Sequence, residues 1–349
     1  MDEEAAELPR CAEIPTVLPA DKTASPHGPN FPAMRNRPVI ALAAVLCTSA
    51  CGTPRRGAET NPFPEGLWDA HTHIAYWGAD ALDSLTKYGV VGVRDLGGNP
   101  ELLRKWRDEI ARGVRRGPRM YYSGPHINGP RADSTDRLIV RTAEDGRRAV
   151  DSLAKLGVDF IKTHVQIPPD AYFAILRQAK LRHLKVASHT GSEIPVWQAA
   201  DSGAASIEHM SDAVFPSPMY AGYVKTLREA ANWWLSPAGD TMIAHIVRTG
   251  VAIDPTLYAY VPWISEGATE ETRNGRQRVY EFHIDLTRRF HKAGATILAG
   301  SDFADRNYDV DPGRSLIQEM AELAKAGLSP AEVRAAASTN IINWLRKRP

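Results

Sequence analysis

The stretch Gly66-Leu67-Trp68-Asp69-Ala70-His71-Thr72-His73-Ile74 is an apolar run that ends in two histidines one residue apart. Its composition predicts a buried β-strand. On a strand, residues i and i+2 point to the same face, so both imidazoles can reach one point in space and hold one divalent ion. The alternative is that His71 and His73 are ordinary polar groups on a surface-facing strand.

Four further polar residues each close a short apolar run. They are Lys162 in 159–164, His189 in 185–189, His209 in 206–209 and Asp302 in 297–302. Parallel barrels assemble their active sites at the C-terminal ends of their strands, which is where these residues are predicted to lie. Each alone has an ordinary explanation, such as a satisfied polar group or a helix cap. Together they predict one convergent site.

The order H-x-H, Lys, His, His, Asp along successive strands resembles the amidohydrolase superfamily. The segments GLWDAHTHI, GVVGVRDLGG, GPRMYYSGP, FIKTHV, SIEHM and GSDFA resemble, more narrowly, its imidazolonepropionase-related branch, which includes the prolidase-like Xaa-Pro dipeptidases. The resemblance extends from Gly66 to Asn340. It implies a metal-dependent hydrolase of carbon–nitrogen bonds, most closely a prolidase-like dipeptidase that acts on small amide or dipeptide substrates.

The pattern of strands and helices agrees with this resemblance. Strand-like runs near 67–73, 90–95, 119–123, 158–164, 185–189, 205–209, 251–257 and 295–301 alternate with helical patterns such as 100–112, 142–156, 170–182 and 240–249. About eight such units predict an α/β fold, a (β/α)₈ TIM barrel over residues 66–349. Most relatives add a small β-sandwich that flanks the barrel. Here it is expected to be largely absent, so the barrel is expected to stand alone or to form a homo-oligomer.

The resemblance also implies a role for each residue of the site. His71, His73 and Asp302 are expected to bind one divalent ion, and His189 and His209 a second. Lys162, carbamylated by CO2, is expected to bridge the two ions, for which Zn²⁺ is the expected metal. A lysine ammonium would repel the ions, whereas a carbamate supplies two anionic oxygens.

In this scheme a water that bridges the metals acts as the nucleophile, and Asp302 acts as general base and acid. If Lys162 is instead an ordinary lysine, the chain is expected to be a single-metal hydrolase of cyclic amides or a deaminase. Lactone or phosphotriester hydrolysis is a further alternative. A non-enzyme alternative is an inactive metal-binding lipoprotein, which the intact set of ligand positions disfavours.

Substrate contacts are expected from the loops that follow the strands. The candidates are Tyr258, His126 and His164, the last of which shares a strand face with Lys162. Each has a structural alternative: packing, a turn, or a hydrogen bond to a carboxylate. The segment 216–237, which contains Trp233 and Trp234, is expected to be either an aromatic lid or a buried helix. Arg94-Asp95 is expected to be structural.

The composition is that of a soluble globular protein with a sizeable core. The 349 residues are 43% hydrophobic and 24% charged, and 42 basic residues nearly balance 41 acidic ones. The net charge is therefore close to zero and shows no excess of basic residues for binding nucleic acid, so no nucleic-acid partner is expected.

The N-terminal region predicts export. Residues 34–51 contain charged, apolar and small-residue parts in the order of a signal peptide, and small residues precede Cys51 as at a bacterial lipoprotein cleavage site. We expect a periplasmic protein or a lipoprotein anchored to a bacterial membrane through lipid on Cys51. Cleavage there would remove Cys11 and Cys47 and leave no disulfide. Residues 1–33 are expected to be an unstructured extension or to follow a misplaced start, and 52–65 a linker.

Overall fold

The computed structural model describes residues 64–130, 137–191, 194–209, 227–265, 269–303 and 311–347. The expectations for residues 1–63 (leader, lipidated cysteine and most of the linker) lie outside this part of the chain. Within the described residues, no helix is both long and apolar enough to cross a membrane.

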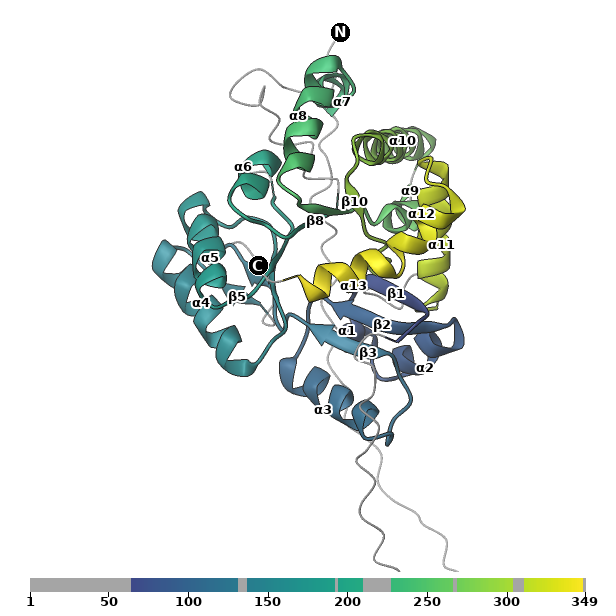
Figure 1. Cartoon of the computed structure of the whole chain (residues 1–349). Helices are drawn as coiled ribbons and strands as arrows, with labels where there is room; N and C mark the ends of the chain where they lie inside the picture. Colours follow the sequence, from purple (N-terminus) through teal and green to yellow (C-terminus); the bar gives the residue numbers. More distant parts are fainter. Residues whose placement is uncertain are drawn as a thin grey trace, which may run out of the picture. The chain divides into compact units, whose positions relative to one another are not determined.

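The strands form two sheets in which every pairing is parallel (Figure 1). The first sheet has the order β1 (Leu67–Thr72), β2 (Val90–Asp95) and β3 (Arg119–Tyr122). The second has the order β10 (Thr296–Ile297), β9 (Ala252–Asp254), β8 (Ser206–Glu208), β7 (Val186–Ser188), β6 (Ile161–Thr163), β4 (Ile127–Asn128) and β5 (Leu138–Ile139). The predicted α/β class with parallel sheets is confirmed.

All eight predicted strand runs contain an observed strand. The two-residue strands β4 and β5 were not predicted, because so short an element carries no alternation of side chains for a sequence pattern to reveal.

Helices follow most of the strands. They are α1 (Ile74–Trp77), α2 (Asp80–Lys87), α3 (Pro100–Ala111), α4 (Ala143–Leu156), α5 (Pro169–Leu181), α6 (Val196–Asp201), α7 (Leu227–Trp234), α8 (Pro237–Arg248), the 3-10 helix η1 (Leu257–Ala259), α9 (Tyr260–Ser265), α10 (Glu270–Lys292), α11 (Arg314–Lys325), α12 (Pro330–Ala336) and α13 (Thr339–Arg346).

The four helices that the sequence predicts are present, and local capping explains their bounds. Asn99 accepts hydrogen bonds from two backbone amides at the start of α3, and Pro100 occupies the first helical position. Thr142 and Asp145 form a reciprocal capping box at the start of α4, which ends at Gly157 in the left-handed conformation.

Backbone hydrogen bonds also connect the two sheets. The Ala70 amide donates to Ala299 O at 2.9 Å, and the Asp302 amide donates to His71 O at 2.8 Å. A parallel bridge joins Thr72 to Phe303. The chain that follows β10 therefore runs beside β1, which brings the H-x-H motif and Asp302 together although they are far apart in sequence.

The N-terminal ends of several strands are covered by α13. Trp344 of this helix donates its indole N–H to Ala205 O, just before β8, at 3.0 Å, and its ring meets that of Phe160, just before β6, edge to face at 5.4 Å. The Trp68 amide, near the start of β1, donates to Ala337 O. Apolar packing thus occupies this end of the strands, and the predicted polar site lies at the other.

Trp68 packs across the backbone of β2. It is fully buried, and Gly92 is its register partner. A Cβ on Gly92 would lie 2.4 Å from three carbons of the Trp68 ring, so this position has no room for a side chain.

We therefore expect Gly92→Ala to lower the free energy of unfolding by about 1–3 kcal/mol, because it overpacks the contact with Trp68. Urea unfolding followed by circular dichroism measures the change. Gly275→Ala is the control, since this helical glycine has open space around it and the alanine is expected to stabilise α10 by about 0.5–1 kcal/mol. Equal stability of Gly92→Ala and wild type would contradict the close contact.

Candidate metal centre

Six histidines form a closed circle at the C-terminal ends of the strands. Neighbouring ring centroids lie 4.6–5.3 Å apart around the circle. We call this set the histidine ring: His71, His73, His126, His164, His189 and His209. Every histidine that the sequence singled out as a candidate is in it.

Asp302 contacts the histidine ring from the end of the last strand. Its Oδ1 lies 3.4 Å from His71 Nε2 and 3.2 Å from His73 Nε2, and its Oδ2 lies 3.7 Å from His209 Nδ1. Ligand atoms of His71, His73 and Asp302 all lie within 4.8 Å of one another. This spacing is small enough for one cation to be held by all three side chains.

Lys162 of β6 shares this buried environment. The side chain is 1% exposed, and its Nζ has no hydrogen-bond partner among the described residues. Burial lowers the pKa of Lys162 to about 8, although the negative charges of Glu208 and Asp302 partly offset the effect. A buried, unpartnered amine that is easily neutralised can react with CO2, as the expected carbamate requires.

Burial favours the neutral, metal-binding form of four histidines of the ring. Burial, the largest cause, lowers the pKa values of His73, His126, His164 and His209. Burial raises the pKa of Asp302, but the charge of His71 and the hydrogen bond from His73 outweigh it and hold that pKa below its usual range. Neutral imidazoles with an ionised carboxylate are a donor set that fits divalent ions such as Zn²⁺.

Three buried residues beneath His71 were not predicted as part of the site. Glu208 Oε2 lies 3.2 Å from His71 Nδ1, and Asp254 Oδ2 lies 3.6 Å from the same atom. Arg94 donates to both carboxylates, at 3.0 and 3.2 Å. One feature of the sequence could have indicated that Glu208 lies near the site: it directly precedes His209 in the SIEHM motif.

Arg94 and Asp95, which the sequence suggested as a structural pair rather than a substrate clamp, contact different groups. Arg94 binds the two carboxylates beneath His71. Asp95 accepts from the Ile74 amide at 2.7 Å and from the Gly97 amide at 3.4 Å. Burial raises the pKa of Asp95 to about 7.

A buried aspartate also fixes the backbone on both sides of the proposed cation position. Asp69 Oδ1 accepts from the His71 amide at 3.1 Å and from the Ser301 amide at 3.0 Å, and its Oδ2 accepts from the Ser301 hydroxyl. Burial raises the pKa of Asp69 to about 6. These bonds tie the H-x-H strand to the residue that precedes Asp302.

The predicted substrate contacts divide into two groups. His126 and His164 are in the histidine ring, where their rings stack at 5.3 Å. Both nitrogens of His126 are buried and have no hydrogen-bond partner within the part of the chain that the structure describes. Tyr258 is in η1, and its backbone amide donates to Glu319 Oε2 at 2.6 Å. The structure thus gives Tyr258 a contact with α11 and does not bring it into the ring.

The described part of the Trp233-Trp234 segment is helix α7. Trp234 is fully buried, and its ring meets that of Trp233 edge to face at 5.1 Å. This agrees with the alternative of a buried helix for residues 227–234. Residues 216–226 lie outside the described part of the chain.

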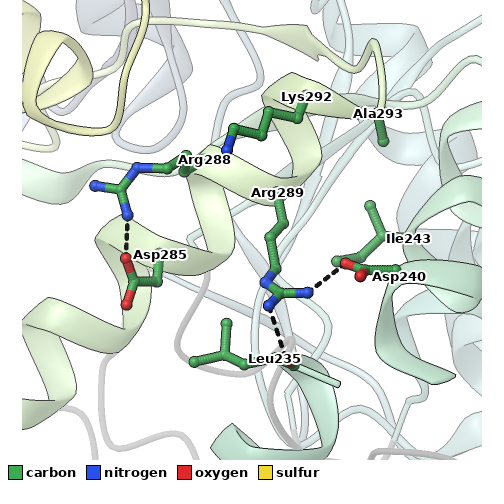
Figure 2. A pocket seen from close by; sticks show the side chains of 8 residues that line it. All are labelled: Leu235, Asp240, Ile243, Asp285, Arg288, Arg289, Lys292 and Ala293. Carbon is green, nitrogen blue, oxygen red and sulfur yellow. Dashed lines mark hydrogen bonds and ion pairs between the residues drawn. The ribbon is translucent and has the colours of Figure 1, made fainter. Parts of the chain in front are cut away.

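A separate pocket of about 610 Å³ lies between α8 and α10 (Figure 2). No residue of the histidine ring lines it. Figure 2 shows that Arg288 is paired with Asp285, and Arg289 with Asp240 and Leu235 O. Its arginines are thus already neutralised, and we assign no role to this pocket.

Comparison with solved structures identifies the fold. Over 80% of the chain, it matches a Xaa-Pro dipeptidase with bound methionine in its active site (TM-score 0.62, 19% identity, 75% of that chain). It also matches ochratoxinase from A. niger over 80% of this chain and 71% of that chain, with a TM-score of 0.61 and 19% identity. A candidate prolidase from Bifidobacterium longum matches over 80% of this chain and 69% of that chain, with a TM-score of 0.59 and 26% identity. No protein-family model and no curated protein matches it.

The chain therefore has the fold of these solved structures, and an amidohydrolase structure matches it in the same way, over 81% of the chain (TM-score 0.61, 20% identity). Its similarity in fold to a Xaa-Pro dipeptidase and a candidate prolidase agrees with the resemblance seen in its motifs.

Buried neutral histidines make a testable contribution to the pH dependence of stability. Because the folded-state pKa of His126 lies well below 6.5, the unfolded state binds more protons below pH 6.5. Stability from this residue is therefore lost as the pH falls below about 6.5, by up to about 1.4 kcal/mol per pH unit. His126→Asn, which cannot titrate, is expected to lose less stability than wild type between pH 6.5 and 5.5.

Urea unfolding of the metal-free protein at several pH values measures this difference. The raised pKa values of Asp69 and Asp95 act in the opposite sense, but equally in both proteins. His183→Asn is the control, because His183 is exposed. Parallel stability curves for wild type and His126→Asn would show that His126 is not held neutral.

Proposed function

We propose that this chain is a metal-dependent hydrolase of amide bonds in small molecules, with a prolidase-like dipeptidase activity. The observation that carries the proposal is the contact of Asp302 with three members of the histidine ring. It is supported by the buried Lys162, whose Nζ has no hydrogen-bond partner among the described residues. Buried polar atoms without partners are costly, so a set of them at one place indicates a bound group.

The proposed ligands follow the pattern that the sequence resembles. His71, His73 and Asp302 would hold one divalent ion, His189 and His209 would hold a second, and Lys162 would supply carbamate oxygens to the ions once it is carbamylated. We also infer that the two parallel sheets together form a (β/α)₈ barrel, because these ligands all lie at the C-terminal ends of its strands. Zinc is the proposed metal, since neutral imidazoles and a carboxylate suit it.

In the proposed hydrolysis, Asp302 is the side chain that moves the proton. Bound divalent ions supply an acidified water and a polarised carbonyl. Asp302, ionised because its pKa is lowered, accepts the proton of the attacking water at a carboxylate oxygen. It returns that proton to the amide nitrogen as the carbon–nitrogen bond breaks. One water is consumed, and a carboxylic acid and an amine are released.

Substrate and cellular location are part of the same proposal. A Xaa-Pro dipeptide is the proposed substrate because two of the matched structures are a Xaa-Pro dipeptidase and a candidate prolidase. His126 and His164 are proposed to contact it, since they belong to the ring but not to the ligand set.

We propose that residues 34–51 direct export and that Cys51 carries a lipid anchor.

We expect Asp302→Asn to lower kcat for a Xaa-Pro dipeptide by about 10²–10⁴-fold, because the amide cannot accept the proton. Asparagine keeps the shape of the side chain, so zinc is expected to remain bound in part. The measurement is turnover of a series of dipeptides by Asp302→Asn and by wild type. Asp201→Asn is the control, because it removes an exposed carboxylate at the end of α6. An active Asp302→Asn enzyme would remove this residue from the mechanism.

Elemental analysis tests the bridge. Protein prepared with zinc and bicarbonate is expected to contain about two ions per chain, and Lys162→Met about one. With ¹³C-labelled bicarbonate, wild type is also expected to show a carbamate carbon signal that the variant lacks. Lys185→Met is the matched control, since Lys185 also has a pKa lowered to about 8 by burial but packs against Trp344. Two ions in Lys162→Met would contradict a bridging role.

A further inference from the structure

The two nitrogens of His71 face different kinds of groups. Nε2 faces Asp302 Oδ1 at 3.4 Å, on the side of the proposed cation. Nδ1 faces the protein interior, where Glu208 Oε2 lies at 3.2 Å. Both residues of the inner contact are completely buried. The protonation of a neutral imidazole at one nitrogen leaves the other nitrogen free to bind a metal, so the inner contact decides which nitrogen is available.

The Glu208 carboxylate is fixed in place by other groups. Arg94 Nη2 donates to both of its oxygens at 3.0 Å, and the Ser206 hydroxyl donates to Oε1. Ser206 and Glu208 are both on β8, so one strand supplies the acceptor and one of its donors. A carboxylate held by three such bonds cannot turn away from His71 without breaking a charge-assisted hydrogen bond.

Arg94 is itself anchored from both sides. Its Nε donates to Ala70 O of β1 at 2.7 Å, and its guanidinium lies 4.4 Å from the centre of the Trp344 ring. Contacts with β1 and α13 therefore fix the position of Arg94, and its hydrogen bonds in turn fix the position of the Glu208 carboxylate. Asp254 is the other acceptor near His71, but its distance of 3.6 Å from Nδ1 is longer than that of Glu208.

We propose that Glu208 is a positioning residue that holds the proton of His71 on Nδ1 and thereby presents Nε2 to the metal. Arg94 and Ser206 fix the carboxylate, the carboxylate fixes the tautomer and orientation of the imidazole, and the imidazole is thereby pre-arranged for the cation. This role rests on the proposed metal site, because His71 needs a defined tautomer only if it binds an ion.

The first test uses the metal-free protein. Long-range ¹H–¹⁵N NMR correlation of histidine-labelled protein distinguishes the two tautomers, and His71→Asn assigns the signals of this residue. Wild type is expected to show His71 protonated at Nδ1. A His71 protonated at Nε2 in wild type would overturn the proposal whether or not any variant folds.

The second test compares zinc affinity, measured by competition with a chelator. Glu208→Gln keeps the size of the side chain but removes its charge, so we expect zinc affinity to fall roughly 10–100-fold, with the appearance of the Nε2-protonated form of His71. Glu322→Gln is the matched control: Glu322 is also buried and accepts a hydrogen bond, from Tyr280, but does not contact the histidine ring. Glu322→Gln is expected to leave the zinc affinity and the tautomer of His71 unchanged.

The outcomes separate this proposal from the proposed function. If wild type fails to bind zinc, the proposed metal-dependent function is wrong. If wild type binds zinc and Glu208→Gln binds it equally well with an unchanged His71 tautomer, the function stands and the role of Glu208 is overturned. If Glu322→Gln weakens binding as much as Glu208→Gln, the effect is general destabilisation, and that result also overturns the specific role.

Discussion

The arrangement of the site depends on a buried guanidinium. Arg94 extends from β2 and donates to Ala70 O of β1, to Ser206 and Glu208 of β8 and to Asp254 of β9. Burial of a lone charge costs several kcal/mol, and here carboxylates and hydrogen bonds offset that cost. The charge of Arg94 holds the pKa of Glu208 well below its usual range despite burial, whereas burial and Glu208 raise that of Asp254. Strands from both sheets are thereby tied to one point.

Two layers follow from this arrangement. The lower layer contains Arg94, its carboxylates and the aromatic ring of Trp344, and nearly all of its polar groups have partners. The upper layer is the histidine ring with Lys162, where the nitrogens of His126 and the Nζ of Lys162 are buried and have no hydrogen-bond partner among the described residues. The satisfied layer supplies rigidity, and the unsatisfied layer is where a ligand gains binding energy. This division explains why polar residues accumulate in the middle of an otherwise apolar core.

The sequence predicted the parts of this structure that repeat or that combine into motifs. Eight strand runs and four helices were predicted in this way and are present. The six proposed metal ligands were singled out because polar residues at strand ends visibly interrupt apolar runs, and their roles as ligands stay a prediction. Arg94 and Asp254 escaped notice as parts of the site, since a charged residue inside a strand gives no sign of its partners on strands more than a hundred residues away. Likewise, only the structure shows that Tyr258 is held through its backbone.

The backbone at the strand exits restricts which residues these positions accept. His209, Thr256 and Asp302, which follow β8, β9 and β10, have φ values of +66°, +47° and +50°. Asparagine and glycine enter this left-handed region easily, whereas β-branched residues are strained there, as Thr256 itself is. During evolution, loss of a ligand at His209 or Asp302 would therefore pass most readily through asparagine or glycine. Valine or isoleucine at either position would instead add backbone strain at the strand exit.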